Sequence, residues 1–214
     1  MFVPFYLTVT FAGIVAAVIV PRIYPLSKKK DTYYNGETTK IDESIPEGHT
    51  SLSWGYEQAI TKARKNSSIK EFFVDGSKNV LDMWIGVLPV VMCMATIALI
   101  IATYTPLFRI LGLPFVPILQ LLQVPEALQA SQTLVVGFAD MLLPSVVAST
   151  TITSEMTRFI VAAVSVTQLV YMSEVGGVLL GSKIPINIKE LIIIFIERTL
   201  ITLPVIVLIA NLIY

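Results

Sequence analysis

The sequence is poor in charged residues, cysteine and histidine. Asp, Glu, Lys and Arg make up 14% of its 214 residues, against about 25% in average soluble domains, and the formal net charge is zero. A neutral chain argues against a nucleic-acid partner, which a basic surface would attract. The single cysteine, Cys93, excludes an intrachain disulfide. The single histidine, His49, has no second imidazole or thiol near it, so a His/Cys metal site is not supported.

Catalytic motifs are also missing from the chain. We find no nucleophile elbow, phosphate-binding loop or metalloprotease motif. An intramembrane hydrolase would need a Ser or Cys paired with a base, or two aspartates. The apolar segments contain one aspartate, Asp140, and no histidine. We therefore expect no enzyme activity, no cofactor and no bound metal.

Long uncharged runs are what the sequence has instead. Hydrophobic residues make up 55% of the chain, and its mean hydropathy is +0.77. No charged residue occurs at positions 83–102 or 199–214. A helix that crosses about 30 Å of hydrocarbon needs about 20 such residues. The sequence therefore predicts an all-α, polytopic membrane protein whose first partner is the lipid bilayer.

The first uncharged run covers residues 2–20 and predicts a transmembrane helix within a segment 1–21. A signal peptide is the alternative, but the run lacks a charged n-region and a cleavage-type end. Ten of the fifteen Lys and Arg residues lie between Arg22 and Lys78. The positive-inside rule then places the loop 22–82 in the cytoplasm and the N-terminus outside.

Two parts of this loop have the apolar spacing of helices. Segments 51–65 and 69–84 predict amphipathic helices that lie at the cytoplasmic membrane interface, with a solvated linker as the alternative. Residues 31–50 are rich in turn formers and acids and predict irregular structure. The loop is therefore expected to form a cytoplasmic helical unit.

Residues 83–214 are interpreted as a membrane domain with interrupted helices. After a span at 83–104, the apolar segments 106–128 and 131–150 contain Pro and Gly, which disfavour a regular helix. In lipid, a broken helix persists only where protein or water satisfies its freed backbone groups, and transporters use such breaks to hold ions and solutes. We therefore expect broken or re-entrant helices, with proline-kinked spans as the alternative. The remaining expected elements are a long helix at 157–180, a turn at 181–187 and a last span at 188–214.

Four ionisable residues fall within apolar segments, where each costs about 2.5–3.5 kcal/mol at the centre of a span. Asp140 has no Lys or Arg within seventeen residues on either side, which favours a functional role. Glu197 and Arg198 predict either a structural ion pair or part of a transport site. The hydroxyls of residues 149–154 either bind a polar solute or cap the next helix through Thr153 or Ser154. The predicted substrate- or ion-binding residues are Asp140, Gly137, Gln132, Thr150, Thr151, Gln168, Glu174 and Glu197.

Several strings between residues 70 and 214 resemble those of a known family. They are TPLFRILGLPFVPILQLLQVPEALQAS, VGFADMLLPSVV, VSVTQLVYMSE and SKIPINIKELIIIFIERT. They resemble the YjiH-type bacterial inner-membrane proteins, which are grouped with the nucleoside-recognition, or Gate, domain family. The resemblance implies a permease-like core in the bacterial inner membrane that handles a nucleoside or another small solute. It also implies that Asp140 is the acid of the string G-x-A-[DE]-M-x-L-P, and that residues 197–199 are the family's ERT.

Many proteins of this type are longer, and the chain resembles their C-terminal half. A single unit lacks the inverted second copy that would complete a central site. The resemblance therefore implies a homo-oligomer or a complementary membrane subunit. Two functions remain open: a solute transporter or half-transporter with Asp140 near a midplane site, and a non-transporting membrane interaction or assembly protein. In the second, the polar intramembrane residues hold oligomer contacts.

Overall fold

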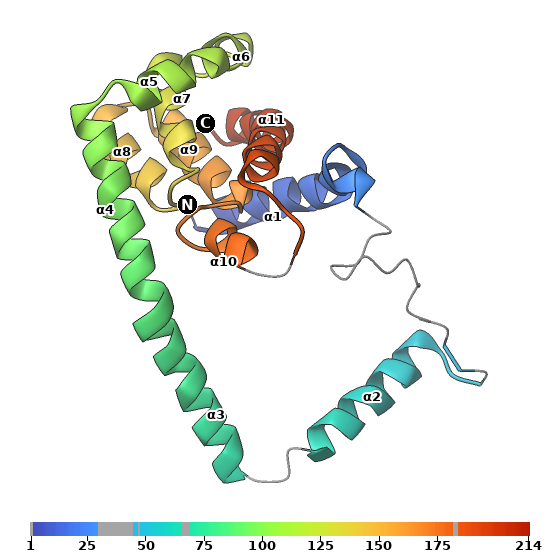
Figure 1. Cartoon of the computed structure of the whole chain (residues 1–214). Coiled ribbons are helices and arrows are strands. Elements are labelled where there is room, and N and C mark those ends of the chain that lie inside the picture. Colours follow the sequence, from blue (N-terminus) through green and yellow to red (C-terminus); the bar gives the residue numbers. More distant parts are fainter. Residues whose placement is uncertain (1, 30–44, 47, 66–68, 182–183) are drawn as a thin grey trace.

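The computed structural model describes residues 2–29, 45–46, 48–65, 69–181 and 184–214. Within these ranges every regular element is helical and none is a strand, so the predicted all-α class is confirmed. Figure 1 shows a cluster of helices built from both ends of the chain, and an arm, residues 51–104, that extends away from it. The irregular segment predicted at 31–50 lies largely outside the described residues.

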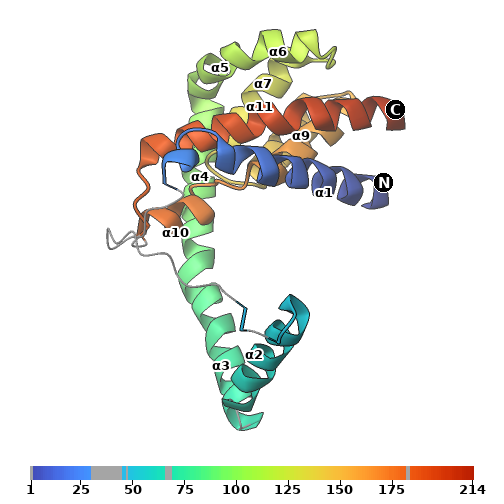
Figure 2. The same ribbon diagram turned by 90° about the vertical axis from the view of Figure 1, so that its right-hand side faces the viewer.

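Two helices of the described chain are long and apolar enough to cross a membrane. They are α1 (Phe2–Ile19), which continues through a short 3-10 turn to Arg22, and α11 (Ile188–Ile213). Figure 2 shows them side by side and antiparallel, with the N- and C-termini of the chain at the same end. The first and the last predicted spans are therefore neighbours in the fold.

The main core lies where α1 and α11 meet α9 (Glu155–Gln168). The buried face of α1 carries small residues every four positions, and Thr8, Ala12 and Ala16 are all 0% exposed. Small side chains let helix backbones approach closely, which is how membrane helices pack without a hydrophobic driving force between them. The larger buried side chains come from the facing helices: Ile160, Val161, Val164, Leu203, Ile206 and Val207.

The turn after α1 is attached to the start of α11. Lys29 Nζ forms an ion pair with Glu190 Oε2 at 2.8 Å and also donates to the Pro185 carbonyl. Glu190 closes a capping box with Asn187 at the same helix start. One end of α1 and one end of α11 are therefore held together by charge and hydrogen bonds.

The arm contains α2 (Ser51–Lys65) and one continuous helix over residues 69–104. The latter comprises α3 (Ile69–Asp82), a π-helical segment Met83–Val87 and α4 (Leu88–Tyr104). Helices were predicted at 51–65 and 69–84, and both are confirmed as helices. The sequence predicted a boundary between loop and membrane domain at residue 83. The composition changes there, but the helix continues without a break. The π segment precedes Pro89, which lacks a backbone donor, and π turns accommodate such local disruption. Both views show this helix running across, rather than along, α1 and α11.

Proline interrupts the next apolar segment without ending it. The chain forms α5 (Leu107–Gly112), a 3-10 turn Leu113–Phe115 and α6 (Val116–Leu121), as expected from the positions of Pro114 and Pro117. Gly112 is required where α5 packs on α7 (Ala127–Val136), because a Cβ there would lie 2.9 Å from the Ser131 carbonyl oxygen.

Two further interruptions divide the remaining helices. The segment predicted to be broken at Gly137 and Pro144 forms α7 (Ala127–Val136) and α8 (Leu143–Thr151), with residues 137–142 unwound between them. The long helix predicted at 157–180 is wrong, because α9 ends at Gln168 and α10 spans Val175–Gly181. Leu169 adopts a left-handed conformation, with φ of 60°, at this second break.

Candidate functional site

The two unwound segments, residues 137–142 and 169–174, pair with each other. The backbone N–H of Met172 donates to the Phe138 carbonyl at 2.9 Å, and that of Ser173 donates to the Ala139 carbonyl at 3.1 Å. Backbone groups released by a helix break must find partners wherever water is excluded. Here the backbone N–H groups of the second segment donate to the backbone carbonyls of the first, so the two interruptions form one structural unit.

Asp140 lies within this unit and is 4% exposed. Its Oδ1 accepts the backbone N–H of Leu142 at 2.8 Å, and its Oδ2 accepts the Ser173 hydroxyl at 2.9 Å. No Lys, Arg or His of the described chain forms an ion pair with it. The carboxylate thus joins the two breaks through one neutral donor from each, without an ion pair to any described cationic side chain.

Gln168 lies at the other end of the unit, where α9 stops, and is fully buried. Its Nε2 donates to the Leu134 carbonyl at 3.2 Å and to the Thr199 hydroxyl at 2.9 Å. Its Oε1 has no hydrogen-bond partner among the described residues. A Cβ at Gly137 would lie 2.2 Å from this oxygen, so glycine is needed for Gln168 to occupy its place.

Buried hydroxyls continue from Gln168 along the contact between α9 and α11. The Thr167 hydroxyl donates to that of Thr202 at 3.2 Å, and Thr199 accepts from Gln168. We call the set Asp140, Ser173, Gln168, Thr199, Thr167 and Thr202 the polar seam. The sequence predicted Asp140 and Gln168 but not the other four as site residues. The four share one signal in the sequence, a hydroxyl in an apolar segment, and Thr199 also belongs to the ERT string at residues 197–199.

The predicted ion pair between Glu197 and Arg198 is absent from the described contacts. Consecutive residues of a helix point in different directions and do not face each other. Arg198 Nε instead donates to the Thr167 carbonyl at 2.9 Å, which attaches it to the polar seam. Glu197 Oε2 is buried and has no hydrogen-bond partner in the described chain.

The remaining predicted site residues lie elsewhere. Glu174 follows Ser173 but lines an apolar hollow between α10 and Met83 of the arm. Gln132 lines a pocket on α7. Thr150 and Thr151 are exposed, and their hydroxyls donate to the Val147 carbonyl of their own helix. The predicted residues therefore fall into separate groups, of which the polar seam contains Asp140 and Gln168 and has Gly137 beside it.

The hydroxyl cluster at residues 149–154 caps the N-terminus of α9. Ser154 is the N-cap, as predicted for this cluster, and its hydroxyl accepts the Thr157 N–H at 3.3 Å. The Glu126 carboxylate, which the sequence did not point to, accepts from the Thr153 hydroxyl at 2.5 Å and from the Thr153 and Ser154 N–H groups. These bonds, the Thr153 hydroxyl first, lower the pKa of Glu126 from its ordinary value.

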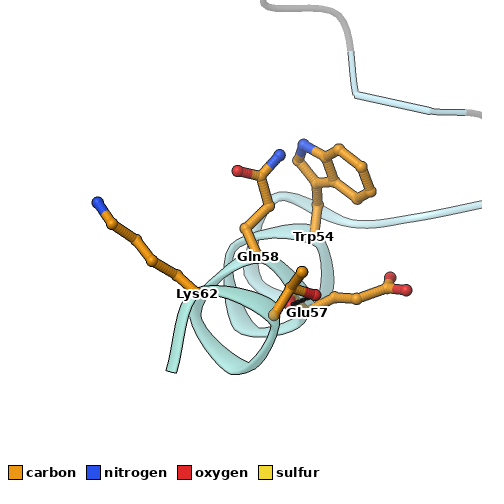
Figure 3. A pocket seen from close by; sticks show the side chains of 5 residues that line it. Trp54, Glu57, Gln58 and Lys62 are labelled. Atoms are coloured by element: carbon orange, nitrogen blue, oxygen red, sulfur yellow. Dashed lines mark hydrogen bonds between the residues drawn. The ribbon is translucent and has the colours of Figure 1, made fainter. Parts of the chain in front are cut away.

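A hollow on the arm is unrelated to the polar seam. Its lining residues all come from α2, and Figure 3 shows Trp54, Gln58 and Lys62 along one side of that helix. The lining is a surface strip of one helix, so it lacks the convergent walls that enclose a small molecule. Within the described ranges, no three His, Cys, Asp or Glu side chains gather where they would hold a metal ion.

Comparison with known proteins gives one long match. A protein of Alkalihalophilus pseudofirmus, described as uncharacterized, is 56% identical over 211 residues. The match covers 99% of the chain but 45% of that protein, so the chain spans a little under half the length of this relative. No family model and no solved structure matches the chain. The resemblance to YjiH-type proteins therefore stays a prediction from the sequence strings.

Proposed function

We propose that the chain is a solute transporter or half-transporter of the bacterial inner membrane, with its site where the two unwound segments meet. The observation that supports this most is Asp140, a buried carboxylate that bonds to both breaks and pairs with no cationic side chain among the described residues. Ionisable residues inside membranes are costly and are retained for transport paths and binding sites. α1 and α11 would be two spans of a multi-pass protein.

Near Asp140 and Gln168 the electrostatics of the polar seam favour a cation or a solute rich in hydrogen-bond donors, whereas Arg198 lies at its Thr167 end. α7 ends at Val136 and α9 at Gln168, and the C-terminal end of a helix carries partial negative charge. The Asp140 carboxylate and the unpaired Gln168 Oε1 add acceptors to this region. A coupling cation would be held by such oxygens, and a nucleoside, the solute class that the resemblance implies, would donate hydroxyl and amine hydrogens to them.

The oligomeric state is part of the proposal. The relative from Alkalihalophilus pseudofirmus is more than twice the matched length, since the match covers 45% of it. A central transport site commonly lies between two related halves. A second copy of the chain or a complementary membrane subunit would therefore supply the other half.

Uptake into proteoliposomes tests the proposal. The full chain would be reconstituted and the flux of radiolabelled nucleosides, sodium ions and protons measured for wild type, Asp140→Asn and Asp75→Asn. Asp75 lies on α3 of the arm and serves as the matched control. We expect flux in wild type and Asp75→Asn and a loss of about tenfold or more in Asp140→Asn, as for removal of a charged binding group. Normal flux in Asp140→Asn would remove Asp140 from the site, and no flux with any solute would count against transport.

The second candidate function is a membrane assembly protein, and the arm favours it. Phe72, Phe73, Trp84 and Ile85 of the continuous helix are 67–74% exposed. Exposed apolar surface of this extent is typical of a protein or membrane contact. If Asp140→Asn abolished oligomer formation in detergent while wild type showed no flux, this second function would be supported.

A further inference from the structure

A pocket separate from the polar seam lies at the corner where the end of α4 meets α5, α7 and α8 (Figure 1). Its volume is about 250 Å³. Phe108, Val136 and Val147 form its apolar walls, and Thr105, Arg109 and Gln132 supply its polar groups. Phe108 also packs with Val136 and Leu143, which flank the first unwound segment, and with Ala139 within it.

Arg109 has no counter-charge in the described part of the chain. It forms no hydrogen bond or ion pair with any described residue, and the side chains around it on α5 are exposed and apolar. Leu107, Ile110 and Leu111 are 46%, 59% and 49% exposed. If α5 lies in the membrane, as the proposed function has it, a guanidinium among its apolar side chains is costly unless an anion neutralises it or it reaches the membrane interface. Arg109 therefore lacks a neutralising anion among the described residues.

Gln132 places a second polar group in the same pocket. Its side-chain amide makes no hydrogen bond within the described residues, although its neighbours on α7, Ser131 and Thr133, both donate to carbonyls of their own helix. An amide NH2 and a guanidinium both present N–H donors, and the guanidinium matches the two oxygens of a carboxylate or phosphate. Both groups lie in a concave site with an apolar wall, which is the usual form of a small-ligand pocket.

We propose that this pocket binds an oxyanion, a phosphate or carboxylate group, held by Arg109 and Gln132. The group belongs either to the headgroup of an anionic lipid or to a free anion. The proposal rests on the proposed membrane location but not on transport, because the pocket shares no lining residue with the polar seam. The pocket reaches Val136, the last residue of α7, so its occupant contacts the residue next to the break.

Native mass spectrometry and thermal unfolding of the full chain test the pocket. The chain would be released from nanodiscs of phosphatidylglycerol or of phosphatidylcholine, and separately titrated with inorganic phosphate and with acetate. Arg109→Gln, Gln132→Leu and Arg109→Lys would be compared with wild type. Arg64→Gln, on α2 far from the pocket, is the matched control. Circular dichroism in detergent confirms that each variant is helical.

We expect retention of phosphatidylglycerol, or stabilisation by phosphate or acetate, in wild type and Arg64→Gln. Binding should be about tenfold to hundredfold weaker in Arg109→Gln and several-fold weaker in Gln132→Leu, with partial recovery in Arg109→Lys. If Arg109→Gln loses only the retention of phosphatidylglycerol, the bound oxyanion belongs to a lipid headgroup. If it loses only the stabilisation by phosphate or acetate, the pocket binds a free anion. Equal binding of every probe to wild type and Arg109→Gln, or no binding of any probe to wild type, would overturn the proposal. If Arg109→Gln does not fold, Gln132→Leu and Arg109→Lys decide the outcome by the same comparison.

Discussion

At the residue scale, two buried side-chain oxygens have no hydrogen-bond partner in the described chain: Gln168 Oε1 and Glu197 Oε2. An unpaired buried acceptor costs about 1–3 kcal/mol, so each of the two needs a physical explanation. Gln168 Oε1 lies against Gly137, three residues before Asp140. A ligand that donates a hydrogen bond, or a cation that an oxygen can coordinate, would satisfy Gln168 Oε1, in line with the proposed function.

Gly137→Ala tests how tightly this region is packed. The added methyl group would lie 2.2 Å from Gln168 Oε1 and 3.1 Å from the Leu134 carbonyl oxygen, so Gln168 must leave its two hydrogen bonds. We expect the free energy of unfolding to fall by about 1–3 kcal/mol, measured by thermal unfolding in detergent. Gly13→Ala on α1 is the control, because nothing lies within 4 Å of its Cβ position, and there we expect no loss. Equal stability of the two variants would contradict this packing.

At the element scale, local composition predicted one helix break and missed the other. Gly137 and Pro144 weaken the helix from within, so the break between α7 and α8 is visible in the sequence. The break after Gln168 contains no Pro or Gly, and Leu169 takes a left-handed conformation that favours glycine. This break is held by hydrogen bonds from Met172 and Ser173 to the other unwound segment, and such long-range contacts leave no local pattern.

The residue that ends the turn after α6, Gln123, has a left-handed backbone conformation. Gln123 has φ of 57° and donates its N–H to the Gln120 carbonyl, while Val124 donates to that of Leu119, which is a Schellman motif with glutamine where glycine is usual. Because Gln123 is exposed, Gln123→Gly should raise the free energy of unfolding by up to about 1 kcal/mol. Gln120→Gly, in the right-handed part of α6, should lower it by about 1 kcal/mol. Thermal unfolding of both variants would show opposite signs, and a loss of stability in both would refute the motif.

The start of α9 depends on pH through Glu126. Hydrogen bonds from Thr153 and Ser154 lower its pKa below 4.5, its ordinary value, so the folded state binds the proton less readily than the unfolded state. Its stabilising contribution is therefore present above pH 4.5 and is lost as the pH falls through the lowered pKa. We expect Glu126→Gln to be less stable than wild type at pH 7 and the difference to shrink below about pH 4. Denaturant unfolding across this range measures it, with exposed Glu57→Gln on α2 as control. A difference that did not change with pH would argue against the carboxylate's role.

At the scale of the whole molecule, hydropathy predicted the helical class and its first and last spans, and the structure shows that α1 and α11 are antiparallel neighbours. Their packing was not predictable. The small residues Thr8, Ala12 and Ala16 show which face of α1 is packed, but not which helix packs on it. The orientation of the arm relative to α1 and α11 could not be predicted either, since residues 83–104 have the composition of a membrane span whatever the direction of their helix.

The antiparallel pair makes a prediction about topology. If α1 and α11 both cross the membrane, residues 2 and 214 lie on one side and Lys28 on the other. With Cys93 replaced by alanine, cysteines placed at Phe2 and Tyr214 should react with a membrane-impermeant maleimide from outside intact cells. A cysteine at Lys28 should react only after lysis. Labelling of Phe2 and Tyr214 variants from opposite sides would contradict the arrangement.

The central claim is that the meeting point of the two unwound segments, around Asp140, is a binding site. The most direct measurement is the unfolding temperature of the full chain as sodium ions or nucleosides are added, for wild type and Asp140→Asn. We expect a ligand-dependent rise of the unfolding temperature in wild type, which corresponds to a gain of about 2.7 kcal/mol in stability at a ligand concentration one hundred times Kd, and a much smaller rise in Asp140→Asn. A rise of the same size in both proteins, at the same ligand concentrations, would contradict the claim.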